Sequence, residues 1–270
     1  MEISVKSWAS LAPEVRMMIL EVLIEDGGYI ARYATVCREW QTFVEQKNFG
    51  WLTLTLSRLA SFDITVNQRR RHVKYIWLCI ELQQYDCLLC EDPETDSWHE
   101  SNTRIVGRAI RELLAVLSTW DASGSLMLDI SVHSPSDSKH HFKSLRFGSD
   151  AVPESDDDDE PFDVNDPRHG WINGELVSLP PGKSINRLFE DIEMASDFWQ
   201  DLPEVPAVTG LLLRRQTRRR WEPRTLGNLF DRLPRLQELY YESWREWGRL
   251  DQRWTDKSIF ENLPLRMTLY

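Results

Sequence analysis

Apolar positions within the first fifty residues recur at helical spacing and predict three short helices. The first begins at Pro13 and Glu14, because proline is tolerated in the first helical turn and a carboxylate suits the positive end of the helix dipole. Glycines 27 and 28 end this helix. Helical spacing returns over residues 29–37 and again over residues 40–44. The first helix carries a broad apolar face made of Val15, Met17, Met18, Ile19, Leu20, Val22, Leu23 and Ile24.

This apolar face is wider than one small neighbouring helix could cover. Three short helices in about 40 residues also lie near the lower size limit for independent folding, because they bury too little of their surface. We therefore expect the face to contact another protein. The alternative is that it packs only on the rest of this chain, which is the usual role of an amphipathic helix.

Beyond residue 50 the pattern alternates between strand and helix. Residues 51–56 have a period of two, which predicts a strand, and residues 59–72 are predicted to be helical. Residues 73–82 carry apolar side chains on both faces, which favours a strand of a parallel sheet. An amphipathic helix over residues 106–117 and a strand over residues 126–133 follow. This order predicts a right-handed crossover and the α/β class.

Turn-forming residues dominate the middle of the chain, from 134 to 183. One strand is predicted there, over residues 142–147, and the acidic run near 150–166 is predicted to be a surface loop. Ser184 is then expected to cap a short amphipathic helix. The apolar residues of that helix are Ile185, Leu188, Phe189 and Ile192.

A repeat marks the C-terminal third of the chain. Leu-Pro pairs begin at residues 202, 233 and 263, at spacings of 31 and 30 residues. A helix opened by Pro223 precedes the second pair, and a strand-like run follows each pair. These runs are residues 211–213, 239–241 and 267–269. Units of this kind suit a leucine-rich-like solenoid, in which each unit buries its apolar face on its neighbours.

The N-terminal residues resemble a known family. Leu11, Glu14, Ile19 and Leu23, followed by the run Val36-Cys37-Arg38-x-Trp40, are similar to the pattern of the F-box. Ala12 stands where that pattern has proline, and Pro13 directly after it can set the same first turn. The remainder, especially residues 73–91 and 211–221, is similar to the substrate-side region of filamentous-fungal F-box proteins with irregular leucine-rich-like repeats.

The resemblance implies two parts: a three-helix F-box over residues 1–50 and a leucine-rich-like, substrate-binding domain over residues 51–270. It implies that the first part docks on the Skp-type adaptor of a cullin RING ubiquitin ligase, and that the second presents a protein substrate. The residues expected to bind the adaptor are Leu11, Pro13, Glu14, Ile19, Leu20, Leu23, Ile24, Val36, Cys37 and Trp40.

Composition narrows the class of protein further. The formal charge is −11, but nine acidic residues lie within residues 150–166, so the acidity belongs to one segment. No apolar run reaches the roughly 18 residues needed to span a bilayer, and the first residues lack a basic and then apolar leader. Four irregularly spaced cysteines favour a reducing compartment. We therefore expect a cytoplasmic or nuclear protein with no membrane partner.

Candidate chemistry is sparse. Cys87 and Cys90 form the one pair with metal-ligand spacing, and Cys79, His99 or His72 could complete a set of four ligands. A second close pair, normal in structural zinc sites, is absent, so we expect neither metal nor cofactor.

The usual catalytic motifs are also absent, because no nucleophile elbow, phosphate loop or His-Glu-x-x-His occurs. We therefore expect a protein without catalytic residues. Two alternatives stay open: an interaction scaffold that does not direct ubiquitination, and an enzyme that uses the Cys87 and Cys90 pair.

Arginine and aromatic residues concentrate between residues 214 and 254. The pI near 5.1 lies far below the value above about 9 expected of a nucleic-acid-binding domain, so we expect a protein partner rather than nucleic acid. Guanidinium groups grip carboxylate or phosphate through parallel hydrogen bonds, which favours an acidic or phosphorylated substrate. The residues predicted to form this surface are Arg218, Arg219, Arg220, Trp221, Arg245 and Trp247.

Overall fold

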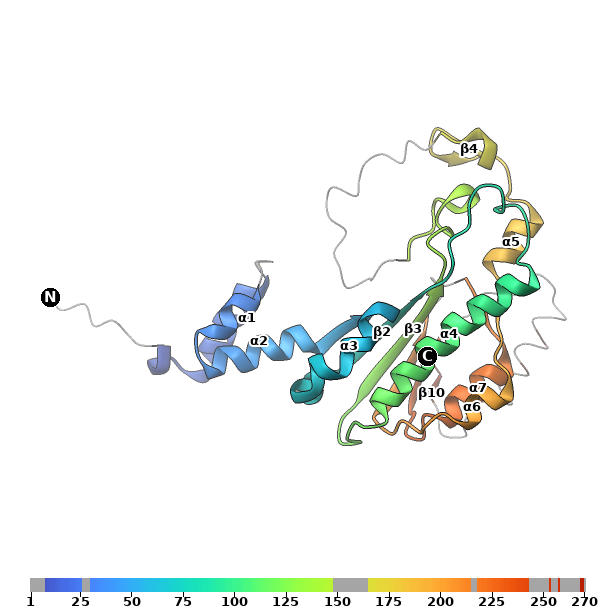
Figure 1. Cartoon of the computed structure of the whole chain (residues 1–270). Coiled ribbons are helices and arrows are strands. Elements are labelled where there is room, and N and C mark those ends of the chain that lie inside the picture. The colour runs from blue at the N-terminus through green and yellow to red at the C-terminus, as the bar shows by residue number, and fades with distance from the viewer. Residues whose placement is uncertain are drawn as a thin grey trace.

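The computed structural model describes residues 8–25, 30–147, 165–214, 218–242, 253, 257 and 268–269. Figure 1 shows a helical arm, residues 8–50, at the N-terminal end of a sheet with helices packed on it. The described elements of the arm are the 3-10 helix η1 (Trp8–Ser10), α1 (Pro13–Glu25), the 3-10 helix η2 (Ile30–Thr35) and α2 (Arg38–Gly50). The three helical segments expected over these residues are confirmed, although the middle one is a 3-10 helix.

Six strands form one parallel sheet in which neighbours in space are also successive in the chain. These strands are β1 (Trp51–Leu54), β2 (Tyr75–Glu81), β3 (Leu126–His133), β7 (Val208–Leu213), β9 (Glu238–Tyr241) and β10 (Thr268–Leu269). The α/β class and the parallel sheet are therefore confirmed, as are the strands expected at each of these places.

Parallel neighbours require connections that return to the same end of the sheet, and helices form most of these connections. Helix α3 (Leu56–Val66), continued by η3 (Asn67–His72), joins β1 to β2, and α4 (Asp96–Leu117) joins β2 to β3. The β3–β7 connection contains α5 (Gly182–Leu188) and α6 (Ser196–Gln200), and α7 (Pro223–Asp231) lies between β7 and β9. Thr95 caps α4 and Glu222 caps α7, each through its side chain.

The core lies between the helices and one face of the sheet. The strand register aligns aliphatic side chains in two rows across this face. One row holds Leu52, Ile76, Leu128, Leu211 and Leu239, and the other holds Leu54, Leu78, Ile130 and Leu213. Helices α3, α4 and α7 add residues such as Phe62, Leu113 and Leu229 to the same cluster. The apolar positions that alternate along the strands therefore lie on the face that the helices cover, as the sequence pattern predicts.

Shorter elements surround the ends of the long strands. Strands β4 (Trp171–Ile172) and β5 (Glu175–Leu176) form an antiparallel hairpin, and β6 (Asp191–Ile192) pairs in parallel with β8 (Arg220–Trp221). Two 3-10 turns, η4 (His140–Phe142) and η6 (Pro167–His169), lie before and after the acidic segment.

Two local predictions are wrong. Residues 142–147 form no strand, because the chain there completes η4 and then packs Phe147 flat on His133 at 4.5 Å between ring centroids. Ser184 does not cap α5, since that helix begins at Gly182 and Ser184 lies buried inside it. Ile192 belongs to β6 rather than to this helix.

The arm joins the sheet without a linker. Helix α2 ends at Gly50 and β1 begins directly after it at Trp51. The amide of Lys74 donates to the Gly50 carbonyl, and Glu45 of α2 pairs with Arg69 of η3 at 3.0 Å. Most of the acidic segment expected to form a surface loop lies outside the described residues.

Candidate functional site

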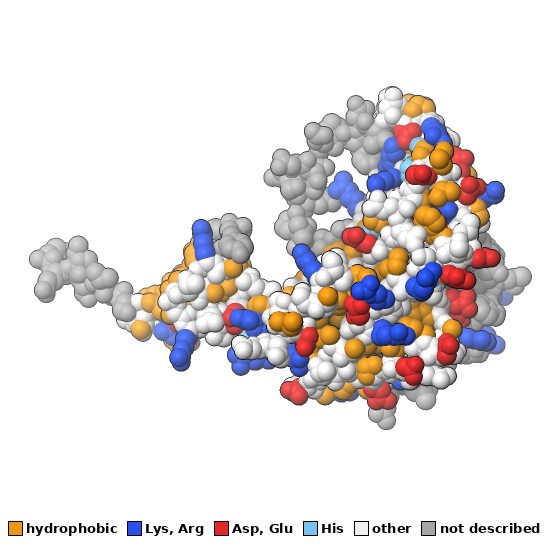
Figure 2. All heavy atoms as spheres, viewed as in Figure 1, with side chains coloured by type: hydrophobic (Ala, Val, Ile, Leu, Met, Phe, Trp, Pro, Cys, Tyr) orange, Lys and Arg blue, Asp and Glu red, His pale blue; other side chains and the backbone are white. Residues whose placement is uncertain are grey.

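Helix α1 carries an exposed apolar face. Val15, Met18 and Val22 lie at helical spacing with exposed fractions of 42%, 63% and 57%. Met17 and Ile19 flank this row, and Val36, at the start of the turn into α2, is 58% exposed. We call Val15, Met17, Met18, Ile19, Val22 and Val36 the apolar patch. Figure 2 shows apolar side chains on the surface of the arm, away from the body of the sheet.

Aromatic and charged side chains inside the arm hold α1 in place. The Trp40 ring of α2 lies 5.2 Å from Trp8 and 5.9 Å from Tyr33, measured between centroids. Glu39 accepts a hydrogen bond from the Trp8 indole at 2.9 Å and pairs with Arg16 of α1 at 3.1 Å. These contacts join all four elements of the arm.

The residues expected to bind the adaptor divide into three groups by exposure. Leu20 is only 2% exposed, so it packs inside the arm and is not available to a partner in this conformation. Half-buried positions are Leu11, Leu23, Ile24 and Trp40, and exposed positions are Pro13, Glu14, Ile19, Val36 and Cys37. The expectation that Leu20 widens the exposed face is therefore corrected.

The arginine surface expected near residue 219 is also corrected. Arg219 is buried, because its guanidinium pairs with the buried carboxylate of Glu94 at 2.6 Å. Burial is the largest single effect on Arg219 and opposes its charge, but the hydrogen bond to Glu94 and the negative charges of Glu94, Asp137 and Glu190 together raise the pKa of the guanidinium. Trp221 is buried in the main core. Arg220 is half-buried and pairs with Asp191 at 3.0 Å.

The remaining residues of that predicted surface are not brought together in the described part of the chain. Arg218 is half-buried, and Arg245 and Trp247 lie outside the described residues.

The second face of the sheet, opposite the core, is polar and aromatic. Trp51 stacks on Tyr75 across β1 and β2, with ring centroids 3.5 Å apart. The Tyr75 hydroxyl donates to Asp129 of β3 at 2.5 Å, and Arg214 after β7 donates to Asp129 at 2.7 Å. Burial, followed by the hydrogen bond to Asp129, raises the pKa of Tyr75. The ionic partners of Tyr75 lie far from it in sequence, so the sequence pattern gave no sign of them.

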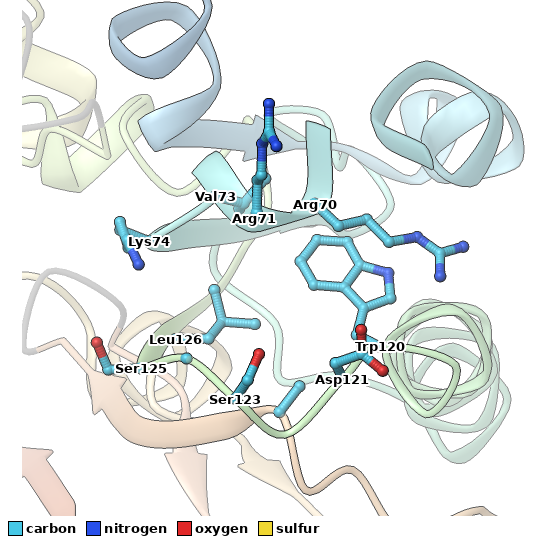
Figure 3. A pocket seen from close by; sticks show the side chains of 11 residues that line it. Arg70, Arg71, Val73, Lys74, Trp120, Asp121, Ser123, Ser125 and Leu126 are labelled. Carbon is cyan, nitrogen blue, oxygen red and sulfur yellow. The ribbon is translucent and has the colours of Figure 1, made fainter. Parts of the chain in front are cut away.

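A basic hollow lies at the N-terminal ends of β2 and β3. Figure 3 shows Arg71 and Lys74 from the segment before β2, with Ser123 and Ser125 from the segment before β3. The hollow has a volume of about 320 Å³, and Trp120 and Asp121 form part of its wall. Arg71 and Lys74 form no ion pair with a carboxylate of the described residues, whereas Arg70 beside them pairs with Asp63 at 2.6 Å. Sequence reasoning missed this hollow because its two walls are separated by about fifty residues.

The cysteine pair meets histidines that the sequence did not connect with it. Cys87 and Cys90 lie beside His140 and His169, whereas Cys79, His99 and His72, the possible further ligands named from the sequence, are not part of this group. Cys79 lies in β2, His99 contacts Glu190, and His72 contacts Arg71. We call Cys87, Cys90, His140 and His169 the Cys/His cluster.

Comparison with known proteins adds no family: no protein-family model, curated protein or solved structure matches this chain significantly. In the part of the chain that the structure describes, no helix is long and apolar enough to cross a membrane.

Proposed function

We propose that this chain is a non-catalytic subunit that recruits a protein substrate to a Skp-cullin type of ubiquitin ligase. The helical arm docks on the Skp-type adaptor, and the adaptor in turn binds the cullin. The observation that carries this proposal is the apolar patch on α1, where Val15, Met18 and Val22 are all exposed on one helix. The N-terminal resemblance to the F-box supplies the identity of the partner.

Contiguity makes the apolar patch a candidate interface. Single exposed apolar side chains are common on protein surfaces, but a contiguous group marks an interaction site. Val15, Met18 and Val22 are contiguous because they lie at helical spacing on α1, and Val36, in the loop before α2, is exposed as well. The internal contacts of Trp40 and Glu39 leave this outer side of α1 free of the packing that holds the arm together.

The sheet supports the substrate-binding half of the proposal. Its strands follow one another in chain order, as in a leucine-rich-like array, and its second face presents Trp51 and Tyr75 beside polar groups. Tryptophan, tyrosine and arginine dominate binding hot spots. The basic hollow near Arg71 and Lys74 suits an acidic or phosphorylated segment of the substrate. Holding a substrate there raises its effective concentration at the ligase without any catalytic residue in this chain.

A binding assay with a recombinant Skp-type adaptor tests the docking step. Met18→Asp with Val22→Asp is expected to weaken binding by well over tenfold, since covering an unpaired carboxylate costs several kcal/mol. Ile64→Asp is the matched control, because Ile64 is an exposed apolar residue of α3, 84% exposed, outside the arm. Equal binding of the double variant and the control would exclude the apolar patch as the docking site.

A cellular experiment then separates a ligase subunit from a scaffold. Proteins recovered by proximity labelling with the full chain are compared with those recovered by the Met18→Asp, Val22→Asp variant. In a ligase subunit, the shared proteins lose ubiquitin in cells that carry the variant, because capture persists while the adaptor is lost. Unchanged ubiquitination of every shared protein would favour a scaffold.

A further inference from the structure

Four potential metal ligands converge at one end of the molecule, near the ends of β2 and β3. The ligand atoms of Cys87, Cys90, His140 and His169 all lie within 4.8 Å of one another. The His169 Nε2 atom is 3.2 Å from the Cys87 sulfur and 3.5 Å from the Cys90 sulfur. Cys90, His169 and the neighbouring His141 are buried.

Three separate segments bring these side chains together. Cys87 and Cys90 lie in a tight turn after β2. In this turn the Asp86 carboxylate accepts hydrogen bonds from the backbone amides of Leu88 and Leu89. His140 opens η4 with a φ of 54°, and His169 ends η6 just before Gly170, whose φ is 79°. Cys87 and His169 are 82 residues apart in sequence. Figure 1 shows the β4 hairpin, which follows His169, beside the loops at this end of the sheet.

Both histidines are oriented by a second contact that leaves Nε2 for a ligand. Asp166 accepts a hydrogen bond from His169 Nδ1 at 2.7 Å, and it also pairs with Lys143 at 2.6 Å. His140 forms a hydrogen bond with the Tyr85 backbone, and its Nε2 is buried without a partner. A carboxylate or carbonyl behind the ring is the usual companion of a metal-bound histidine, because it fixes the tautomer and the ring plane.

The geometry points to a structural zinc site made of Cys87, Cys90, His140 and His169. Zinc binds thiolate at about 2.3 Å and imidazole at about 2.0–2.1 Å, so tetrahedral ligand atoms lie roughly 3.3–3.8 Å apart. The two sulfur to His169 distances already lie close to that range. Four protein ligands fill a tetrahedral shell and leave no open position, which defines a structural rather than a catalytic site. Mixed sulfur and imidazole ligands favour zinc over magnesium or calcium, which prefer oxygen.

The distribution of the hydrophobic core gives this site a role. Among the described residues, the main core cluster has no member between Leu82 and Ile105 and none between Val132 and Ile192. These two stretches contain all four ligands. Where too little apolar surface is buried, a metal can supply the free energy that holds the segments together. Zinc would thus fix the turn after β2 to the segments on both sides of the acidic run.

A second group of side chains nearby competes for the same metal. Cys90, Glu91 and His141 also lie within reach of one another, and His141 Nε2 is 3.6 Å from Glu91. That group has three ligands, one of them an exposed carboxylate, so it is the less complete shell. Histidines 140 and 141 are adjacent in sequence, which allows a direct test between the two sets.

Metal analysis of the full-length chain, purified without chelator, tests the proposal. One zinc ion per chain is expected, and replacement by cobalt should give the absorption of a tetrahedral site with cobalt–thiolate charge transfer. His140→Ala and Cys87→Ser should lower zinc affinity by at least tenfold, and Asp166→Asn, which keeps all four ligands, by about 10–100-fold. Cys37→Ser and His99→Ala are matched controls of the same residue types outside the cluster, and they should keep full zinc content.

Two outcomes would overturn the proposal. A wild-type chain that holds no zinc and gives no cobalt–thiolate signal on titration would do so without any variant, so poor folding of a variant cannot obscure the result. Loss of zinc in His141→Ala together with full retention in His140→Ala would assign the metal to the competing group. Protection of the Cys87 and Cys90 thiols from alkylation until a strong chelator is added would support the four-ligand site.

Discussion

Arg219 illustrates how a single distant partner changes the role of a residue. Its guanidinium lies in the interior against Glu94, and both side chains are almost fully buried. Glu94 also accepts a hydrogen bond from Asn102 of α4 at 3.0 Å. The pair therefore ties the segment before β8 to the start of α4, and its charge is internal to the fold.

Replacing Arg219 with methionine should destabilise the chain by about 3–5 kcal/mol, because the Glu94 carboxylate is then buried without a counter-charge. Urea denaturation of the variant measures this loss. Adding Glu94→Leu should restore much of the stability, since an apolar pair of similar volume often replaces a buried ion pair at little cost.

Arg220 provides the control for this experiment. Arg220 is the half-exposed neighbour of Arg219 and pairs with Asp191. Arg220→Met should therefore lower the free energy of unfolding by no more than about 1 kcal/mol. Equal effects at the two positions would mean that the Glu94 pair has no special weight.

Sequence pattern reveals residue type but not long-range partnership. Arginine is almost never fully buried without a partner, and the partner of Arg219 lies 125 residues earlier, so the run of arginines was interpreted as a surface. The Cys/His cluster was missed for the same reason, because its members are distant in sequence. Its cysteines form a visible short-range pair, but His140 and His169 lie far from that pair in sequence and reach it only through the fold.

At the scale of single elements, periodicity predicted most of what forms. Residues 73–82 are apolar on both faces and become the interior strand β2, and residues 106–117 lie in the buried part of α4. Failures occurred where no periodic apolar run exists. Residues 142–147 were interpreted as a strand, but they contain isolated apolar positions whose contacts, such as Phe147 on His133, are set by tertiary packing.

The arm should respond to mutation separately from the sheet. Trp40 of α2 contacts Trp8 of η1 and Tyr33 of η2 and is half-buried, so its ring contacts lie within the arm. Trp40→Ala should loosen the arm at a cost of roughly 2 kcal/mol, below the 3–5 kcal/mol of a fully buried tryptophan. Limited proteolysis should then cut within residues 8–50, while the fragment that contains the sheet resists.

Phe62→Ala is the matched comparison for that experiment, because Phe62 belongs to the main core. It should expose the sheet domain to protease instead. If Trp40→Ala made the whole chain protease-sensitive, the arm and the sheet would be one cooperative unit.

At the scale of the whole molecule, two regions of the sheet domain differ in the interactions that stabilise them. Over most of its length, the sheet is joined to the helices on one face by the buried aliphatic side chains of the main core. The end beyond Leu82 and Val132 contains polar turns and the Cys/His cluster. The sequence predicted the first region because repeated strand and helix units bury apolar surface on their neighbours. The second region has no repeating pattern, so its arrangement could not be predicted.

The acidic run lies in the chain between two ligand segments and tests this division. Deleting residues 153–161 removes six acidic residues and two prolines. The deletion should change the melting temperature by no more than about 2 °C, because loop-closure entropy varies slowly with length and this composition has little apolar surface to bury. Zinc content should also stay the same, since His140 and His169 both lie outside the deleted stretch.

A second variant separates the effect of charge from that of length. It keeps all nine positions of residues 153–161 but replaces the six acidic residues with serine, and its melting temperature should match that of the deletion. If both variants melted more than about 5 °C lower, the lost stability would be electrostatic, because charge is the one property that both remove. The carboxylates would then pair with cationic side chains of the sheet domain, and Arg71 and Lys74 of the basic hollow would be the first positions to mutate.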